Sequence, residues 1–302
     1  MSQQVPGPRS GPATRRRLRI PALLAIGILP AAFLANPSVA HAAPLAFYVD
    51  KTMGSCSDAG PGTAARPFCT ITKGVSRTRA GYTLYIGWGV FAETIRPLAS
   101  GTATARINIT AWPGRSPIIG AGLTYGANIT GLGYITLSYL RFSGTVADGI
   151  NVLNSNHIIV TNNTVSGAGR PAQSQTAPGI GVRGTTASVV SYNNVHHNNG
   201  SGIILASGTT GTTVWGNSAS YNAEGWRRNA NGILVTAPGN AVLRNATHNN
   251  EDSGIQFYTG GNNNLAALNL TFNNGDHGID NFNVTGGRMI SNTVYHNCAS
   301  GL

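Results

Sequence analysis

The chain of 302 residues is 41% hydrophobic, only 10% charged, and contains 40 glycines. Fifteen of its 20 Lys and Arg residues and all nine Asp and Glu residues follow residue 42, so this part carries a net charge of +6. It has no basic run and no interleaving of aromatic and basic residues, which excludes a nucleic-acid partner. A dispersed basic surface suits acidic polymers and equally suits general solubility.

The first 42 residues have the parts of an export signal. The basic stretch Thr14-Arg15-Arg16-Arg17-Leu18 precedes an apolar run over residues 20–35, and Ala40-His41-Ala42 offers a small-x-small cleavage site. The basic stretch fits a twin-arginine signal and also a plain basic leader. The apolar run is short for a membrane span, and nothing after residue 43 could span a bilayer. We predict a signal peptide over 1–42 and a secreted mature protein with no membrane segment.

Residues 45–81 predict a strand, a disulfide loop and a helix. The strand is expected over 45–50. Cys56 and Cys69 would pair in an oxidising compartment and close a small loop. Apolar residues at helical spacing predict a helix over 68–79, and Gly81 would end it. A repeat protein needs a cap over its first unit, and this helix is the candidate.

Short strands follow this helix, with turn signals between them. We predict strands at 83–86, 94–97, 107–111, 117–119 and 135–142, and turns at 112–114 and 120–122.

From residue 144 onward the chain repeats itself every 22–30 residues. The repeating feature is an Asn residue followed, further along the same unit, by a Gly and an adjoining aliphatic residue. It recurs at Asn163/Gly179, Asn193/Gly202, Asn217/Gly232, Asn245/Gly254, Asn269/Gly278 and Asn292/Gly301. Such a repeat indicates a solenoid. The units are rich in Val, Ile, Thr and Asn and lack helical periodicity, which favours several short strands per coil. We predict an all-β chain folded as a parallel β-helix.

Asparagine occupies two columns of this repeat. The first is Asn163, Asn193, Asn217, Asn245, Asn269 and Asn292, and the second is Asn198, Asn222, Asn250, Asn274 and Asn297. A side-chain amide has donors and an acceptor, so it can bond the turn backbone and the amide of the next coil. Asn also tolerates the left-handed backbone of a sharp corner. We interpret both columns as structural.

Acidic residues concentrate at the end of the chain. Asp252 and Asp276 share one register on adjacent coils, with Glu251 and Asp280 beside them. Equivalent residues of adjacent coils lie about 4.8 Å apart, and two anions at that distance repel by roughly 0.8 kcal/mol in water. Such a cluster needs a cation or a shared proton, and oxygen ligands suit Ca²⁺. The alternative is a solvated row of acids.

Three further residues are candidates for catalysis. His277 lies between Asp276 and the repeat glycine, where it would ligate a metal, orient a carboxylate or titrate near neutrality. Arg244 and Arg288 are expected on strands and are candidates to face the same groove.

Two coils carry insertions just before the Gly-aliphatic pair. They occupy residues 169–178 and 224–229. Insertions in a solenoid map to loops on one face, often the binding face. Trp226 would supply an aromatic platform, and Arg227 and Arg228 would bind carboxylates. The alternative is a solvated loop.

The last residues, Gly301-Leu302, begin another repeat, and Cys298 has no partner in the sequence. We therefore expect a β-helix over 43–302 that is incomplete at its C-terminus, and we expect a monomer.

The motif Asp276-His277-Gly278-Ile279-Asp280, with Asp252 one coil earlier, resembles the right-handed β-helix polysaccharide lyases. The resemblance is closest to the pectate lyase type of polysaccharide lyase family 9 and covers residues 45–302. That family builds a calcium site from an Asp on one coil and an Asp-Asp-Gly-Phe-Asp cluster on the next. Asp252, Asp276 and Asp280 match three ligand positions, and His277 stands at the fourth. The family's base is a lysine beyond the calcium site, and no lysine follows Lys73 here.

The resemblance implies a right-handed β-helix with a small N-terminal helical cap. It also implies calcium-assisted β-elimination on an acidic polysaccharide, pectate or a similar polyuronate. Calcium would stabilise the developing enolate charge. The alternatives are a non-catalytic carbohydrate-binding or surface β-helix, a glycoside hydrolase that uses two of the carboxylates, and an epimerase.

Overall fold

Most of the predicted short strands are present. The computed structural model describes residues 45–169, 177–223, 230–299 and 301, and within these ranges the chain forms 26 strands and one short helix. Paired strands run parallel in all three sheets. In this part of the chain no helix is long and apolar enough to cross a membrane. The predicted signal peptide lies outside the described residues.

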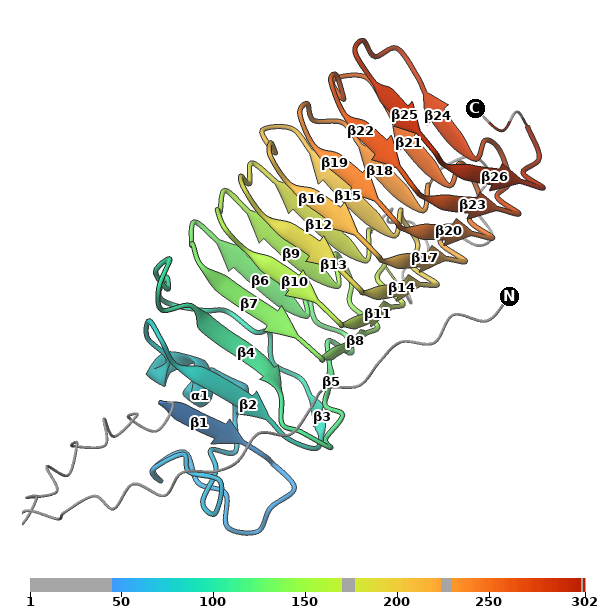
Figure 1. Ribbon diagram of the computed structural model, residues 1–302. Coiled ribbons are helices and arrows are strands. Elements are labelled where there is room, and N and C mark those ends of the chain that lie inside the picture. The colour runs from blue at the N-terminus through green and yellow to red at the C-terminus, as the bar shows by residue number, and fades with distance from the viewer. Residues whose placement is uncertain (1–44, 170–176, 224–229, 300, 302) are drawn as a thin grey trace, which may run out of the picture. The chain divides into compact units, whose positions relative to one another are not determined.

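From β4 onward the chain visits three sheets in turn, A, B and C, and returns to sheet A one coil further along (Figure 1). The described strands of sheet A are β1 (Ala46–Val49), β2 (Thr83–Ile86), β4 (Ile107–Ala111), β7 (Ile135–Ser138), β10 (Ile159–Thr161), β13 (Val189–Ser191), β16 (Thr213–Trp215), β19 (Ala241–Leu243), β22 (Leu265–Ala267) and β25 (Arg288–Ile290).

Sheets B and C are built in the same way from the other strands. Sheet B contains β3 (Val90–Phe91), β5 (Ile118–Ile119), β8 (Arg141–Ser143), β11 (Thr164–Ser166), β14 (Asn194–His196), β17 (Ser218–Ser220), β20 (Ala246–His248), β23 (Leu270–Phe272) and β26 (Thr293–Tyr295). Sheet C contains β6 (Ala127–Thr130), β9 (Ile150–Leu153), β12 (Ile180–Arg183), β15 (Ile203–Ala206), β18 (Ile233–Val235), β21 (Ile255–Phe257) and β24 (Ile279–Asn281). The prediction of a right-handed parallel β-helix is confirmed.

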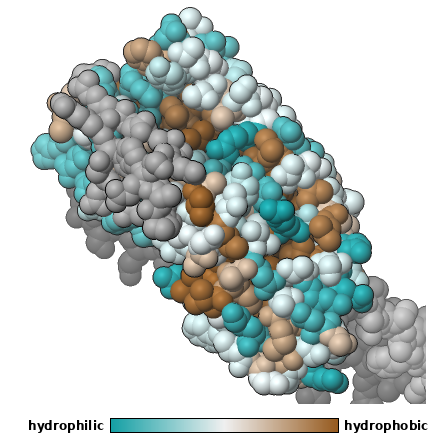
Figure 2. Space-filling view, turned by 180° about the vertical axis from the view of Figure 1, so that it is seen from behind, coloured by the Kyte–Doolittle hydropathy of each residue, from teal (hydrophilic) through white to brown (hydrophobic). Residues whose placement is uncertain are grey.

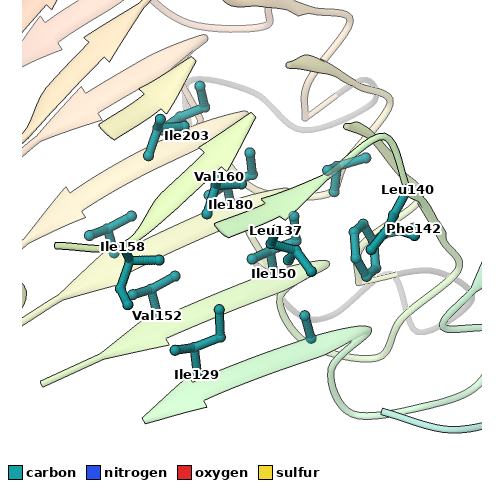
Figure 3. Close-up of a cluster of buried hydrophobic side chains, with 14 of the residues drawn as sticks. Ile129, Leu137, Leu140, Phe142, Ile150, Val152, Ile158, Val160, Ile180 and Ile203 are labelled. Carbon is teal, nitrogen blue, oxygen red and sulfur yellow. The ribbon is translucent and has the colours of Figure 1, made fainter. Parts of the chain in front are cut away.

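Buried and partly exposed side chains alternate along each strand, which separates the core from the surface. In β4, Ile107, Ile109 and Ala111 are buried while the residues between them are half-buried. The inward side chains of successive coils stack into one hydrophobic core, part of which is shown in Figure 3. Each fully buried Val, Leu, Ile or Phe contributes about 1.5–3 kcal/mol, so the stacked aliphatic rows hold the three sheets together.

From β7 onward, the turn between sheets A and B is a single sharp corner in each described coil. The residue at the corner has a left-handed backbone, for example Tyr139 with φ 57° and Tyr192 with φ 53°. The ladder asparagine follows this residue and has no positive φ of its own. The idea that ladder Asn residues themselves take the left-handed backbone is therefore wrong. A side chain at the corner residue points outward, whereas the ladder amide has to point into the turn.

Both asparagine columns form hydrogen-bonded ladders, as predicted. Asn193 is typical: its Nδ2 donates to Val160 O and to Asn217 Oδ1, both at 2.9 Å, and its Oδ1 accepts from Asn163 N at 2.9 Å and Nδ2 at 3.0 Å. The second column repeats this pattern, with Asn222 Nδ2 donating to Asn250 Oδ1 at 3.0 Å. Each buried amide thus satisfies backbone groups that the corner would otherwise leave without partners.

The repeat glycines are required by close packing between coils. A Cβ atom added to Gly232 would lie 2.6 Å from Gly254 O and 2.8 Å from Asn250 Nδ2. Gly202 and Gly254 have equivalent contacts below 3 Å. Side chains other than hydrogen do not fit there, so the Asn ladder and the Gly column depend on each other.

The N-terminal cap is present, and its helix is shorter than predicted. Helix α1 (Ile71–Arg77) follows Thr70, whose side chain accepts from Lys73 N, and it ends at Thr78, where the backbone is extended. Phe68 was predicted to be helical, but it forms a parallel bridge with Val49. The buried residues Ile71, Gly74 and Val75 face the first coils.

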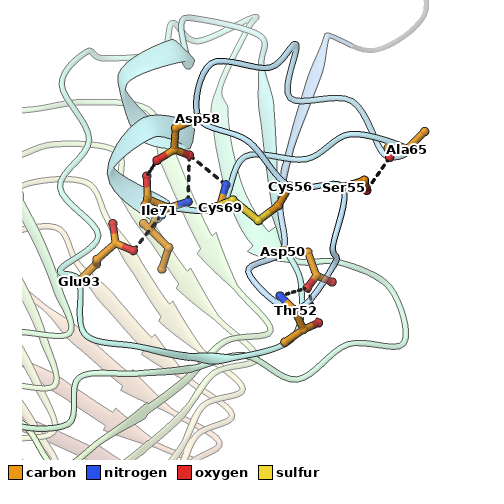
Figure 4. Close-up of a disulfide and its surroundings, with 10 residues drawn as sticks. Asp50, Thr52, Ser55, Cys56, Asp58, Ala65, Cys69, Ile71 and Glu93 are labelled. Carbon is orange, nitrogen blue, oxygen red and sulfur yellow. Dashed lines mark hydrogen bonds between the residues drawn. A yellow bond between two sulfur atoms is a disulfide. The ribbon is translucent and has the colours of Figure 1, made fainter.

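The predicted disulfide is also present. Cys56 and Cys69 are bonded, and Asp58 between them accepts from Cys69 N at 2.9 Å and from Thr70 N at 3.1 Å (Figure 4). Glu93 accepts from Thr72 N at 2.9 Å. These carboxylates satisfy backbone N–H groups that precede and begin α1.

Two of the early strand predictions are wrong in detail. The stretch 94–97 contains no strand, only an isolated bridge between Ile95 and Ala127. The stretch 135–142 is two strands, β7 and β8, separated by the corner at Tyr139. A continuous apolar pattern does not reveal a corner when an aromatic residue occupies the left-handed position.

We predict that Asn193→Ala destabilises the fold by about 2–4 kcal/mol, because it removes four buried hydrogen bonds and leaves the buried backbone N–H of Asn163 without its acceptor. The neighbouring exposed residue supplies the control: Asn194→Ala is expected to change stability by less than about 0.5 kcal/mol. Urea unfolding followed by circular dichroism measures both. Equal effects of the two substitutions would contradict a stabilising ladder.

Candidate functional site: acidic residues at the edge of sheet C

The clustered acids lie in the connections that lead from sheet B into sheet C. Glu251 and Asp252 lie between β20 and β21, and Asp276 occupies the same register one coil later. Asp276 N donates to Asp252 O at 3.3 Å, which confirms that these two residues stack on adjacent coils. Asp280 lies further along the same coil, on β24. Stacking of coils therefore brings four carboxyl groups into one region.

The cluster changes the protonation of one member. Burial, followed by the charges of Asp276 and Glu251 and more weakly of Asp280, raises the pKa of Asp252 to about 6. Removal from water disfavours the ionised carboxyl group, and nearby negative charges disfavour it further. Like-charge crowding thus adds to the effect of burial on Asp252. At mildly acidic pH the carboxyl group of Asp252 is protonated. At higher pH it is ionised, and the greater negative charge of the cluster favours the binding of a cation.

Asp280 is held by a chain of amide side chains that the sequence reading missed. Gln256 Nε2 donates to Asp280 Oδ2 at 2.7 Å, and Gln256 Oε1 accepts from Asn231 Nδ2 at 3.1 Å. Gln256 is paired with Asp280 in the sheet register. The sequence signal was available, because Gln256 and Asp280 each follow the repeat glycine of their own coil by two residues. The chain fixes the orientation of the carboxylate on the outer face of sheet C.

His277 contacts the carboxylate next to it. Its Nδ1 lies 3.1 Å from Asp276 Oδ2, an ion-pair distance, although the angle is too poor for a hydrogen bond. The imidazole remains about a third exposed. The structure thus places His277 among the acids, as the sequence predicted.

The fit of this site to a calcium ion rests on donor chemistry and not on preformed geometry. Carboxylate and amide oxygens are the ligands that Ca²⁺ prefers, and the pKa of Asp252 is raised by burial and, in addition, by the negative charges of Asp276 and Glu251. Within the described ranges, however, no three His, Cys, Asp or Glu side chains are grouped closely enough to hold a metal ion. Binding would require the carboxylates to turn toward one another.

A second charged group lies on the same sheet, several coils earlier. Arg183 on β12 bonds Asp148 through its guanidinium and donates to Asn151 Oδ1 at 2.9 Å, and Asn151 donates to Asn128 Oδ1 at 2.8 Å. Asp148 is only 5% exposed, and its burial raises its pKa despite the opposing effect of Arg183. This pair was not predicted from the sequence, although Asp148 precedes a Gly-Ile pair just as His277 does.

The outer face of sheet C is apolar between these two charged groups. Ile204 on β15 and Leu234 on β18 occupy the row that contains Gln256 and Asp280, and both are half-buried. Beyond this row, Tyr258 and Phe282 stack with ring centroids 5.0 Å apart and are 41% and 51% exposed. The space-filling view from behind shows hydrophobic side chains interspersed with hydrophilic ones (Figure 2). Such a surface offers an apolar floor and polar edges.

Two of the predicted catalytic residues lie elsewhere. Arg244 is the left-handed corner residue after β19 and is exposed, and it does not lie on a strand as expected. Arg288 is exposed on β25 of sheet A. The acids lie at the entry to sheet C, so the structure does not bring either arginine to them. The repeat spacing predicted which coil each arginine belongs to, but not which of the three sheets it lies on.

The predicted substrate-binding residues Trp226, Arg227 and Arg228 lie outside the described residues. Their chain position is between β17 of sheet B and β18 of sheet C. The acids occupy the same kind of connection on the following coils.

With fold and site in view, comparison with known proteins identifies the family. Residues 48–300 match the family described as Pel9A-like, right-handed β-helix region. The chain therefore belongs to the Pel9A-like right-handed β-helix family. No curated protein matches it.

Solved structures share this fold at low sequence identity. A complex of XylC with xylose has a TM-score of 0.69 at 13% identity, covering 85% of this chain and 66% of that chain. The pectate lyase Pel9A has a TM-score of 0.56 at 14% identity, covering 83% and 78%. An alginate lyase from Paenibacillus sp. str. FPU-7 has a TM-score of 0.56 at 15% identity, covering 76% and 97%. At such identities the likeness establishes the fold.

The raised pKa of Asp252 gives a pH-dependent stability prediction. An unfolded Asp has a pKa of 3.8 and the folded residue one of about 6, so the folded state is progressively penalised as pH rises between these values. We predict that Asp252→Asn stabilises the protein by about 1 kcal/mol at pH 7.5, a value reduced for partial exposure. The gain should be largely lost at pH 4. Denaturant unfolding at both pH values measures it, and an equal gain at both would contradict the assignment.

Proposed function

We propose that this protein is a secreted, monomeric carbohydrate-active β-helix that cleaves an acidic polysaccharide, a pectate or similar polyuronate, by β-elimination. The observation that carries the proposal is the crowding of Asp252, Asp276 and Asp280 at sheet C, within a chain of the Pel9A-like family. A polyuronate is itself anionic. Its docking beside these acids therefore needs a cation between them.

Asp252, Asp276 and Asp280 are the proposed holders of Ca²⁺, with His277 beside the ion. When bound, calcium supplies positive charge that binds the uronate carboxylate and favours the enolate that develops there. Gln256 keeps Asp280 directed outward on sheet C. The apolar floor and the Tyr258–Phe282 pair would contact the hydrophobic faces of sugar rings. Trp226, Arg227 and Arg228 are proposed as further substrate contacts.

His277 is the proposed base in place of the family lysine. With Nδ1 3.1 Å from Asp276 Oδ2, its Nε2 is left to accept the proton α to the uronate carboxylate. The contact with Asp276 would orient the ring and stabilise the imidazolium that forms. The electron pair of the broken C–H bond then forms the double bond of the unsaturated product. The glycosidic oxygen departs with the electron pair of its own bond to the uronate.

The raised pKa of Asp252 favours a second candidate, a glycoside hydrolase. A carboxyl group that stays protonated beside ionised carboxylates is the pairing that acid-base hydrolysis uses. Hydrolysis releases reducing ends without a double bond, so one assay separates the two reactions.

We expect the mature protein to release an ultraviolet-absorbing unsaturated product from polygalacturonate or alginate in the presence of calcium. His277→Ala should lower the rate by about a hundredfold or more, because a positioned base contributes at least that factor. Asn194→Ala, remote on sheet B, should leave the rate unchanged. Reducing ends without absorbance would indicate hydrolysis, changed uronate composition without cleavage an epimerase, and polymer retention without product a binding protein. Each of these outcomes contradicts elimination.

Calcium binding is tested separately from catalysis. A ligand that binds only the folded protein raises stability by about 2.7 kcal/mol at 100 times its Kd. We expect millimolar calcium to raise the thermal midpoint of the wild type and to have little effect on Asp276→Asn. Magnesium, which demands strict octahedral geometry, should act more weakly. If calcium leaves the wild-type midpoint unmoved, the acids form a solvated row.

A further inference from the structure

A cavity on the opposite part of the molecule originates in one row of sheet A. The register pairs Tyr48 with Tyr85, Tyr85 with Thr110, and Thr110 with Ser138. The outward side chains along this row therefore change from large aromatic rings to small hydroxyls within one coil. Because β-sheet residues of adjacent strands lie about 4.8 Å apart, this change in size creates a step beside Tyr85.

The step forms one side of a cavity of about 420 Å³. This volume lies in the range of roughly 300–1,000 Å³ that is typical of small-molecule sites. Rings from three successive coils line it: Tyr85 on β2, Trp112 after β4, and Tyr139 at the corner after β7. Tyr139 is 62% exposed because its left-handed backbone directs it outward. The hydroxyl of Thr110, which accepts from Ser138 Oγ at 3.0 Å, also lines the cavity.

An arginine supplies the cationic wall. The stretch Trp112-Pro113-Gly114-Arg115 forms a type II turn, in which Arg115 N donates to Trp112 O at 2.8 Å and Gly114 has φ 76°. The turn folds Arg115 back, so its guanidinium lies over the Trp112 ring at 5.0 Å. The side chain of Arg115 is 31% exposed at the edge of the cavity.

A buried carboxylate fixes the position of this arginine. Asp50 has no exposed side-chain surface, and its Oδ2 lies 3.6 Å from Arg115 Nη1. Thr52 satisfies the other oxygen, donating to Oδ1 from N at 3.0 Å and from Oγ1 at 2.6 Å. At 3.6 Å the Arg115 contact is an ion pair and not a hydrogen bond. A guanidinium has five N–H donors, so Arg115 retains donors for a ligand.

We propose that this cavity binds one hexuronate residue of an acidic polysaccharide. The rings of Trp112 and Tyr139 would contact the apolar faces of the sugar. Arg115 would bind the carboxylate, because a guanidinium pairs with a carboxylate in two parallel hydrogen bonds. Thr110 is available to a sugar hydroxyl. The site lies on sheet A near the N-terminal cap, away from the acids of sheet C, and it would hold the polymer independently of the reaction.

The choice of ligand class follows from the charge and shape of the cavity. A neutral sugar would offer no carboxylate to the Arg115 donors that Asp50 leaves free. A purely apolar ligand would desolvate Thr110 and those donors without giving them partners. The proposal takes its polymer class from the proposed function. It can be disproved independently of that function, however, because it concerns binding at sheet A and not turnover at sheet C.

The test measures monosaccharide binding to the mature protein, by tryptophan fluorescence and saturation-transfer NMR. The probes are D-galacturonate and D-galactose, which differ in the carboxylate. We expect galacturonate to bind more tightly than galactose, and Arg115→Gln to weaken galacturonate binding about tenfold through loss of charged hydrogen bonds. Tyr139→Asn should weaken both sugars by roughly fivefold through loss of ring contact.

The matched control is Tyr192→Asn. Tyr192 occupies the same corner two coils later, with φ 53° and 50% exposure, and does not line the cavity. Asn162, which occupies the corner between them with φ 56°, shows that Asn fits this backbone. The measurement is made with EDTA present, so that a uronate has no calcium through which to bind at sheet C, and under this condition Tyr192→Asn and Asp276→Asn should bind both sugars as the wild type does. Urea midpoints confirm that each variant is folded.

Three results would overturn the proposal. One is equal affinity for galacturonate and galactose in the wild type. Another is loss of binding in Tyr192→Asn as large as in Tyr139→Asn. The last is loss of galacturonate binding in Asp276→Asn with no change in Tyr139→Asn, which would place the sugar at sheet C. Catalytic inactivity of the protein would leave the sheet A result unchanged and so would affect only the proposed function.

Discussion

Hydrogen bonding between successive coils is the constraint on which the rest of this molecule depends. Each coil pairs its strands with those of the coil before and after it, and at the sharp corners side chains have to replace the backbone partners. The asparagine columns do this: Asn245, for example, donates to Leu243 O and Val214 O at 3.0 Å and to Asn269 Oδ1 at 3.1 Å. The regularity of the fold therefore depends on the hydrogen bonds that the asparagines make at its corners.

The same stacking generates the chemistry of the site. A residue in a given register lies next to its counterpart on the following coil, whatever its charge. Asp252 and Asp276 are adjacent for the same reason as Asn250 and Asn274. Amides gain a hydrogen bond from this proximity, whereas carboxylates repel, and this repulsion adds to the effect of burial in raising the pKa of Asp252. Stacking of the coils is thus electrostatically unfavourable at the acids, where the proposed cation would bind.

The two proposed carbohydrate sites use different physical means for the same class of polymer. At sheet C the protein presents acids and would bind a uronate through a cation. At sheet A it presents Arg115, held by the buried Asp50, and would bind a uronate directly. Both sites combine residues of a connection with outward residues of a sheet, Asp280 in sheet C and Thr110 in sheet A, because the inward rows are filled by the aliphatic core. A change from large to small residues along such a row is sufficient to make a cavity, as Tyr85 and Thr110 show.

The sequence by itself determined the repeat, the parallel β-helix, the disulfide, both asparagine ladders and the shared register of Asp252 and Asp276. These follow from spacing, because residues at one register of a solenoid necessarily become neighbours. Only the tertiary structure decided which sheet each residue occupies. It moved Arg244 and Arg288 away from the acids, placed a corner inside 135–142, and joined Gln256 to Asp280. It also brought Asp148 to Arg183 and Tyr85 to Trp112 and Tyr139. The physical reason is that the direction of a side chain depends on where each corner turns, and a corner is set by one left-handed residue, which in this chain is Tyr, His, Leu or Arg as readily as Gly or Asn.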